Sequence, residues 1–323
     1  MGPSRHAMAT SKETVLVTGG AGFIGSHLVE ALLKKKFAVR VLDNFSTGSM
    51  ENLEPTADRV DVVNGDIRSG ADLEQAFRGV TRVAHLASTS SVQRSIDKPL
   101  ETHANNVDGT LALLEAARAA KVKRFVYAGG SAVYGDAADD GPLPLSPYGV
   151  SALGGEAYAM MYHRQHGLPV VCLRLFSVYG PRQDLNSAFA AVIPRFLNAV
   201  HRRDPFPIFG DGHQQRDFTY VGDLVQALLA ALVKPQAVGH VFDIGAGKPE
   251  SILEVARVTA HAAGIKCQVK FMPARPGDPR KSRADLRQAK KLLGYAPKTR
   301  LGDGIAETYA WFRDSRSSGK SGG

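Results

Sequence analysis

Three glycines at three-residue spacing lie in the run Thr18–His27, which reads Thr-Gly-Gly-Ala-Gly-Phe-Ile-Gly-Ser-His. Gly19 allows the chain to turn, Gly22 allows backbone amides to approach an anion, and Gly25 allows a helix to pack closely on a strand. A helix that begins here points the positive end of its dipole at the same place. The spacing therefore predicts that the pyrophosphate of a dinucleotide binds at this turn.

The position of Asp43 supports this prediction. The apolar run Thr14–Val17 precedes the turn, the helical pattern Ser26–Lys35 follows it, and Asp43 ends the next expected strand. A carboxylate at that place accepts a hydrogen bond from a ribose hydroxyl of the dinucleotide. A glycine loop needed only for packing is the alternative, and it does not explain why Asp43 lies there.

The elements that must position these residues alternate along the chain, which predicts an α/β fold with a doubly wound parallel sheet, the Rossmann fold. We expect this dinucleotide-binding domain over residues 10–178, with a strand and a helix within residues 210–245 returning to it. A smaller mixed α/β region for the substrate is expected over residues 179–315, and residues 1–9 and 316–323 are interpreted as tags or disordered ends. Further strands are expected at Val39–Asp43, Val60–Asn64, Val83–Leu86, Arg124–Ala128 and Val170–Leu175, and further helices at Leu100–Ala120, Tyr148–His166, Gly222–Val233, Ile252–Ala262 and Ala284–Leu292.

The composition excludes several classes of protein. No apolar run approaches the roughly 18 residues that span a bilayer, and the N-terminus has no signal-peptide hydrophobic stretch, so we expect a soluble, cytoplasmic protein with no membrane partner. The two cysteines, Cys172 and Cys267, have neither disulfide nor metal-site spacing, and no metal is expected.

The charge balance favours anionic partners. Lys and Arg number 40 against 31 Asp and Glu, which gives a net charge of +9. A nucleic acid is not expected, because the chain has no aromatic-basic cluster and no recognisable reader motif. A phosphorylated substrate accounts for part of the charge, and a group of C-terminal basic residues is interpreted as solvated: Lys281, Arg283, Arg287, Lys290 and Lys291.

From Val15 to about Trp311 the chain resembles the extended short-chain dehydrogenases/reductases, and within them the UDP-sugar 4-epimerases. The resemblance rests on motifs that occur together in one order. They are Gly19–Gly25, Leu42–Gly48, Gly65–Ile67, His85–Ser88, Asn106–Thr110, Val133–Gly135, Ser146–Gly149, Val178–Arg182, Gly210–Gly212, Arg216–Phe218 and Arg275–Asp278.

The resemblance implies NAD as cofactor. Asp43 would hold the adenosine ribose, and NAD is favoured over NADP because the next residue, Asn44, carries no charge to neutralise a 2′-phosphate. The implied cofactor-binding residues are Gly19, Gly22, Phe23, Ile24, Gly25, Asp43, Asn44, Ser46, Thr47, Gly48, Asp66, Ile67, Leu86, Ala87, Ser88, Asn106 and Tyr148.

The resemblance also implies a UDP-sugar as substrate and a homodimer formed through the helices Leu100–Ala120 and Tyr148–His166. Two arginines match those that hold the diphosphate, a role suited to guanidinium groups. The implied substrate-binding residues are Arg216 and Arg275 at the diphosphate, Asp278 near the ribose, Val192 and Ile208 at the base, and Ser91, Arg94 and Ser177 at the sugar. Many epimerases carry asparagine where this chain has Ser177, which leaves the identity of the sugar open.

In these epimerases a tyrosine four residues before a lysine removes the proton of the sugar 4-hydroxyl while hydride passes from C4 to NAD. A serine or threonine shares the hydrogen bond, and the 4-keto sugar then turns over and takes the hydride back on its other face. Tyr148 occupies the tyrosine position, but the lysine position is Ala152 and the serine or threonine position is Gly130. The family lysine lowers the pKa of the tyrosine, which is near 10 in a free side chain.

Ser131 is the candidate substitute for the missing hydroxyl. Adjacent strand residues face opposite sides, so Ser131 can take this role only if the strand end bends, which Gly129 and Gly130 would permit. Otherwise Ser131 is an ordinary polar residue at a strand end. The related 4,6-dehydratases and decarboxylases need an acidic residue just after the serine or threonine position, where this chain has Ser131 and Ala132.

Two functions therefore stay open. One is the NAD-dependent epimerisation of a UDP-hexose at C4 through a transient 4-keto intermediate. The other is a catalytically impaired protein, either natural or engineered, that binds NAD and a UDP-sugar. Gly130 and Ala152 favour it, because the loss of two of three cooperating catalytic residues should abolish most activity.

Overall fold

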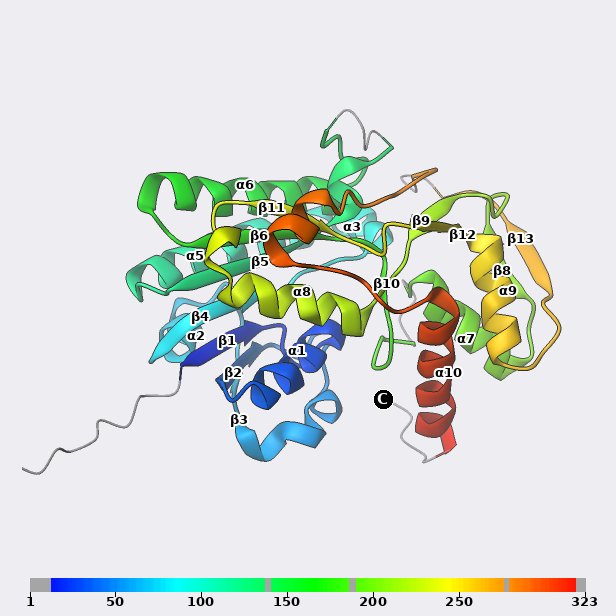
Figure 1. The fold of residues 1–323 in the computed structure, drawn as a ribbon, viewed down its shortest axis with the longest axis horizontal. Coiled ribbons are helices and arrows are strands. Elements are labelled where there is room, and N and C mark those ends of the chain that lie inside the picture. The colour runs from blue at the N-terminus through cyan, green and yellow to red at the C-terminus, as the bar shows by residue number, and fades with distance from the viewer. Residues whose placement is uncertain (1–12, 137–140, 186–189, 276–278, 318–323) are drawn as a thin grey trace, which may run out of the picture.

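A seven-stranded parallel sheet forms the centre of the computed structural model, which describes residues 13–136, 141–185, 190–275 and 279–317 (Figure 1). The strand order is β11-β6-β5-β4-β1-β2-β3, and each neighbouring pair is parallel. The predicted doubly wound α/β fold is confirmed. The strands are β1 (Thr14–Thr18), β2 (Ala38–Asp43), β3 (Val60–Asn64), β4 (Val80–His85), β5 (Arg124–Gly130), β6 (Val170–Leu175) and β11 (Val241–Ile244).

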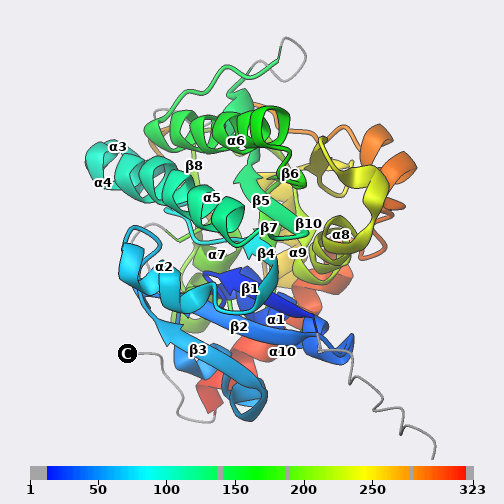
Figure 2. The ribbon, with the colours of Figure 1, turned by 90° about the vertical axis from the view of Figure 1, so that its left-hand side faces the viewer.

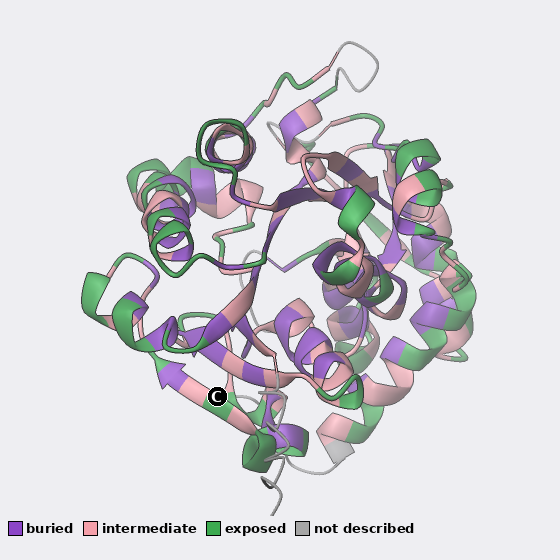
Figure 3. Ribbon diagram, turned by 60° about the vertical axis from the view of Figure 1, so that its left-hand side comes forward, coloured by how far each residue is buried: buried purple, intermediate pink, exposed green. Residues whose placement is uncertain are grey.

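Helices cover both faces of this sheet, because its buried strands carry apolar side chains on both sides. In β1, Val15 and Val17 face one hydrophobic core while Leu16 faces another. Figures 1 and 2 show α1 (Phe23–Lys34) and α8 (Val221–Val233) on the first face. The second face carries α2 (Gly70–Ala76), α5 (Gly109–Ala119) and α6 (Pro147–His166). Figure 3 shows the buried residues along the strands and the inner sides of these helices.

The helix expected at Leu100–Ala120 is interrupted. It consists of α4 (Pro99–His103), a wide π-helical turn η3 (Ala104–Asp108) and then α5. Such turns insert one extra residue and are frequent at functional sites. This one carries Asn106, whose side chain it directs into the protein, where it is buried.

The C-terminal region packs around a third core that includes Phe196, Phe206, Ile208, Val255 and Ile305. It is formed by helices and two-stranded sheets beside the carboxyl ends of the central strands (Figure 1). The helices are α7 (Val192–Arg202), α9 (Ile252–Ala262) and α10 (Leu301–Ser317). The paired strands are β7 (Val178–Tyr179) with β10 (Thr219–Tyr220), β8 (Phe206–Phe209) with β13 (Val269–Met272), and β9 (Gln215–Asp217) with β12 (Pro249–Ser251).

Short helical segments complete the fold. They are η1 (Met50–Asn52), η2 (Glu54–Arg59), α3 (Val92–Asp97), η4 (Ser131–Tyr134), η5 (Pro235–Ala237) and η6 (Ala289–Leu293). None of the helices in the described part of the chain is both long and apolar enough to cross a bilayer.

The helix expected at Ala284–Leu292 is wrong at its start. The backbone amides of Ala284 and Asp285 donate to the carboxylates of Asp217, at 3.0 Å, and Asp243, at 3.1 Å. These bonds hold the two residues in a non-helical conformation, and the helical turn begins only at residue 287.

Candidate active site

The glycine turn connects β1 to α1 at the carboxyl edge of the sheet. Gly19 has a φ of +69°, and a Cβ placed there would lie 2.8 Å from the Ala87 amide nitrogen. A Cβ at Gly25 would overlap the carbonyl oxygen of Gly19. The residue before the helix is Gly22, which has no side chain to cap the first-turn amides, so these donors are available to an anion. The turn therefore fits the pyrophosphate of a dinucleotide.

Asp43 is held rigidly beside this turn at the end of β2. One carboxylate oxygen accepts from the Ala21 amide at 2.9 Å and the other from the Phe45 amide at 2.9 Å. Burial raises the pKa of Asp43, and the two amide bonds act in the opposite direction. A Cβ at Gly48 would lie 3.0 Å from this carboxylate, so the loop passes close to it.

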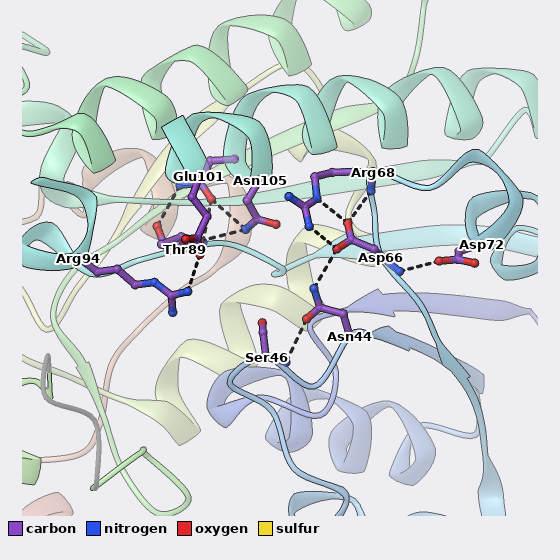
Figure 4. A network of polar contacts seen from close by, with 10 residues as sticks. Asn44, Ser46, Asp66, Arg68, Asp72, Thr89, Arg94, Glu101 and Asn105 are labelled. Carbon is purple, nitrogen blue, oxygen red and sulfur yellow. Dashed lines mark hydrogen bonds and ion pairs between the residues drawn. The ribbon is translucent and has the colours of Figure 1, made fainter. Parts of the chain in front are cut away.

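A polar network that includes Asn44, the residue after Asp43, lies along the same edge (Figure 4). Asp66 accepts a hydrogen bond from the Asn44 side-chain amide at 3.0 Å and forms an ion pair with Arg68 at 2.6 Å. The Arg68 guanidinium holds the pKa of Asp66 well below its usual range. Asn44 and Arg68 face the cavity described next, and Asp66 fixes both of them from outside it. Sequence reasoning missed Arg68, although it follows the Gly65–Ile67 motif directly.

One cavity of about 650 Å³ connects the glycine turn with the candidate catalytic residues. Gly48, Asp66 and Asn106 do not line it. Asp66 and Asn106 hydrogen-bond Asn44 and Thr89, which do, and Gly48 lies against Asp43. The predicted residues that line it are Gly19, Gly22, Phe23, Ile24, Gly25, Asp43, Asn44, Ser46, Thr47, Ile67, Leu86, Ala87, Ser88, Ser131 and Tyr148, together with Ser91, Arg94, Ser177 and Arg216 on the substrate side.

A second cavity of about 320 Å³ shares Ser91, Ser177 and Arg216 with the first. Val192 and Arg275 line it as predicted substrate residues. Its wall includes Phe209, whose ring centroid lies 3.7 Å from the Arg275 guanidinium carbon and 5.1 Å from that of Arg195. Sequence reasoning missed Phe209 and Arg195.

Two predicted substrate residues are not placed in either cavity. Ile208 is fully buried in the third core and lines neither cavity, because β8 directs its neighbours Pro207 and Phe209 into the smaller one instead. Asp278 lies outside the described residues.

The first turn of α6 positions Tyr148. Ser146 caps this helix by accepting a hydrogen bond from the Gly149 amide at 3.2 Å, and Pro147 occupies the first helical position. A Cβ at Gly130 would overlap the Tyr148 hydroxyl, so the tyrosine occupies the space that a side chain at 130 would need. Burial raises the pKa of Tyr148 to about 12.

Ser131 lines the same cavity as Tyr148. The strand β5 ends at Gly130, and the 3-10 turn η4 begins at Ser131. The alternation of side chains along β5 therefore ends at Gly130. It does not direct Ser131 away from the side that Gly130 faces, so Ser131 can face the cavity. Its share in catalysis remains a prediction.

Buried polar contacts tie these segments together. Arg174 on β6 forms a bidentate ion pair with Glu156 on α6, with distances of 2.6 and 2.8 Å, and donates to the Tyr134 hydroxyl at 2.5 Å. Tyr134 in turn donates to Asp243 on β11 at 2.8 Å. The network joins α6, which carries Tyr148, to the turn that carries Ser131.

Two further buried side chains support the cavity wall. Asn106 accepts from the Thr89 amide at 2.7 Å and donates to the Ser151 hydroxyl at 3.0 Å, which connects Thr89 to α6. His85 contacts Thr18 at 2.7 Å and Thr110 at 2.9 Å, and burial lowers its pKa to about 3. His85 is therefore neutral and structural. No group of three or more metal-ligating side chains occurs in the described part of the chain.

The doubly wound sheet, the glycine turn and the fixed Asp43 define a dinucleotide-binding protein, and a second cavity lies on its C-terminal region. The model of the NAD dependent epimerase/dehydratase family matches residues 15–245, and the chain belongs to this family. NAD is the cofactor of this family, and the turn and Asp43 fit it.

Known proteins of similar sequence and structure include several epimerases. A Bacillus subtilis protein named an uncharacterised UDP-glucose epimerase is 38% identical, with coverage of 92% of this chain and 97% of that protein. The UDP-glucose 4-epimerase of Thermotoga maritima, solved with UDP-glucose, has a TM-score of 0.89 at 35% identity and covers 94% of this chain and 99% of that one.

The UDP-glucuronic acid 4-epimerase of Bacillus cereus, solved with UDP-glucuronic acid and NAD, has a TM-score of 0.87 at 35% identity, with coverage of 93% and 99%. Other relatives are named dTDP-glucose 4,6-dehydratase and UDP-glucuronic acid decarboxylase.

Proposed function

We propose that this chain is an NAD-dependent 4-epimerase of a UDP-hexose that acts through a transient 4-keto intermediate. The observation that carries the proposal is the single cavity in which Tyr148 and Ser131 face the space next to the glycine turn, with Arg216 on its wall. The family and the relatives named above support the same reaction class. The lack of a carboxylate at residues 131 and 132 favours epimerisation over the dehydratase and decarboxylase reactions.

In this function NAD, held by the glycine turn and Asp43, would supply the hydride acceptor and donor for C4 of the sugar. The Tyr148 hydroxyl, once ionised, accepts the proton of the sugar 4-hydroxyl, and Ser131 hydrogen-bonds the same oxygen. With a pKa of about 12, only about one Tyr148 in a hundred thousand is ionised at neutral pH. The positively charged nicotinamide ring of bound NAD would lower the pKa of Tyr148 and raise its ionised fraction.

On the substrate side, Arg216 and Arg275 are proposed to hold the diphosphate, with Val192 near the base. Arg275 is stacked on Phe209, which restricts its guanidinium to one orientation. Ser91, Arg94 and Ser177 are proposed to contact the sugar.

The second candidate function is binding of NAD and a UDP-sugar without turnover. The observation in its favour is Ala152, which is 3% exposed and places no cation one helical turn after Tyr148. The relatives named above are enzymes by name and lend it no support.

Product analysis tests these two functions. The protein is incubated with UDP-glucose, UDP-N-acetylglucosamine and UDP-glucuronate, with and without added NAD, and the sugars are separated chromatographically. A C4 epimer of at least one substrate, absent in Tyr148→Phe, is the expected result. Binding of a UDP-sugar without any epimer would refute the epimerase and leave the binding function.

We further propose a homodimer formed through the helical stretch from α4 to α5 and through α6. Helices α3 and α4 pack against α6, and apolar side chains of these helices are exposed, among them Leu100 at 84% and Val150 at 56%. We expect a dimer by light scattering, and expect the double variant Leu100→Glu, Val150→Glu to be monomeric. Val233→Glu, on α8 at the opposite face, is the matched control and should leave the dimer intact.

Because Cys172 and Cys267 are unpaired thiols, we infer a reducing compartment, the cytoplasm.

A further inference from the structure

The segment from Pro279 to Arg283 lies between two parts of the active site. At one end the Arg280 amide donates to Asp136, at 2.6 Å, just after the turn that carries Ser131. Alongside, the Ser282 amide donates to the Gln215 carbonyl at 3.1 Å, next to Arg216 on β9. The segment therefore runs between Arg216, which is proposed to bind the diphosphate, and the turn that carries Ser131. The sugar of a bound UDP-sugar would lie between these two places.

Ser282 is a buried hydroxyl that this fold leaves unsatisfied. The residue lines the larger cavity and is 9% exposed, and its buried oxygen has no hydrogen-bond partner among the described residues. A buried hydroxyl without a partner costs free energy, and such groups in cavities are commonly satisfied by a ligand or a water.

Lys281 and Arg283 flank Ser282 and line the same cavity. Neither forms an ion pair or a side-chain hydrogen bond with another residue in the described ranges. Three other cations that line this cavity differ, because Arg68 is paired with Asp66, Arg94 with Glu101 and Arg182 with Glu30.

Acidic groups near Arg283 are already occupied. The Asp217 carboxylate accepts hydrogen bonds from the Ala246, Gly247 and Ala284 amides. Asp285 is paired with Arg287 at 2.6 Å. Lys281 and Arg283 thus add two cations to this end of the cavity, and neither is held in an ion pair in the described part of the chain.

We propose that Lys281, Ser282 and Arg283 form a binding site for a carboxylate on the sugar, and that the preferred substrate is a UDP-hexuronate. This proposal rests on the proposed function. The diphosphate charges of a UDP-sugar are assigned to Arg216 and Arg275, so a neutral hexose would leave both cations and the hydroxyl without a partner. A carboxylate has two oxygens that accept from a hydroxyl and two cations together.

Calorimetric titration with UDP, UDP-glucose and UDP-glucuronate tests the site without requiring turnover. We expect the wild-type chain to bind UDP-glucuronate about tenfold more tightly than UDP-glucose, as a charge-assisted hydrogen bond would give. The double variant Lys281→Met, Arg283→Gln should lose this preference and keep its affinity for UDP and UDP-glucose. Ser282→Ala should lose part of the preference.

Arg287→Gln removes a cation from the same stretch of chain outside the cavity and should change none of these affinities. Equal binding of the two sugars by the wild-type chain would overturn the carboxylate site alone. So would a double variant that loses affinity for UDP itself, because the cations would then act on the diphosphate. If UDP does not bind the wild-type chain at all, both this site and the proposed function fail.

Discussion

The substitution Ala152→Lys should lower the pKa of Tyr148 and accelerate epimerisation. Side chains four residues apart on a helix have Cβ atoms about 5–6 Å apart. A positive charge about 5 Å from the tyrosinate, at an effective dielectric constant of about 20, stabilises it by about 3 kcal/mol. That corresponds to about two pKa units. The pKa of about 12 in the wild-type chain would then fall to about 10.

The assay is the initial rate of epimer formation as a function of pH. Because the pKa of Tyr148 lies far above neutral, the wild-type rate should rise about tenfold for each pH unit through the neutral and alkaline range. The Lys variant should be about a hundredfold faster than the wild-type chain at each neutral pH and should level off at lower pH.

Ala152 is buried, so any long side chain placed there also disturbs the packing. Ala152→Met is the matched control, because it adds similar length without charge and should give no acceleration. An equal effect of Met and Lys would refute the electrostatic argument. So would a Lys variant that folds normally but keeps the wild-type pH profile.

Three further substitutions have defined outcomes. Gly130→Ser alone should not raise the rate and should lower the free energy of unfolding by about 1–3 kcal/mol in urea denaturation, because its Cβ overlaps the Tyr148 hydroxyl; a faster enzyme would contradict this. Ser177 has a φ of +31°, so Ser177→Asn should stabilise the fold by about 0.5 kcal/mol, seen as a higher urea midpoint. Arg174→Met should destabilise it by about 3–5 kcal/mol because Glu156 stays buried without its partner, and Arg174→Met combined with Glu156→Leu should recover much of that loss.

Most strands of the central sheet could be predicted because each contains a short apolar stretch bounded by glycine, proline or polar residues, although β4 begins at Val80 and not at Val83 as expected. The prediction of β3 (Val60–Asn64) and β6 (Val170–Leu175) agrees with the structure at both ends. The π-helical turn at Ala104–Asp108 could not be predicted, because an inserted residue leaves the apolar periodicity on both sides almost unchanged. The start of the helix expected at Ala284 was wrong because distant carboxylates bind the backbone there.

The candidate site could likewise be predicted only in part from the sequence. The glycine turn and Asp43 could be predicted because one local segment of chain carries all their constraints. Lys281 and Arg283 were interpreted as solvated, and only the pairing of their segment with β9 brings them to the cavity. A basic residue in a polar stretch has the same local sequence context whether it is solvated or lines a cavity.

The order in which the chain visits its two regions limits how this protein could be assembled from parts. After β7 the chain builds α7 and β8 in the C-terminal region, returns to the central sheet with α8 and β11, and leaves again for α9. It then returns once more, since Leu286, Leu293 and Tyr295 pack in the core beneath α1 and α8, before it ends in α10. A C-terminal region with a different ligand preference could not be acquired by joining two gene segments at one point, because each exchange would need several matched junctions. New specificity in such a chain is more readily reached by point changes in its crossing segments, of which 279–283 is one.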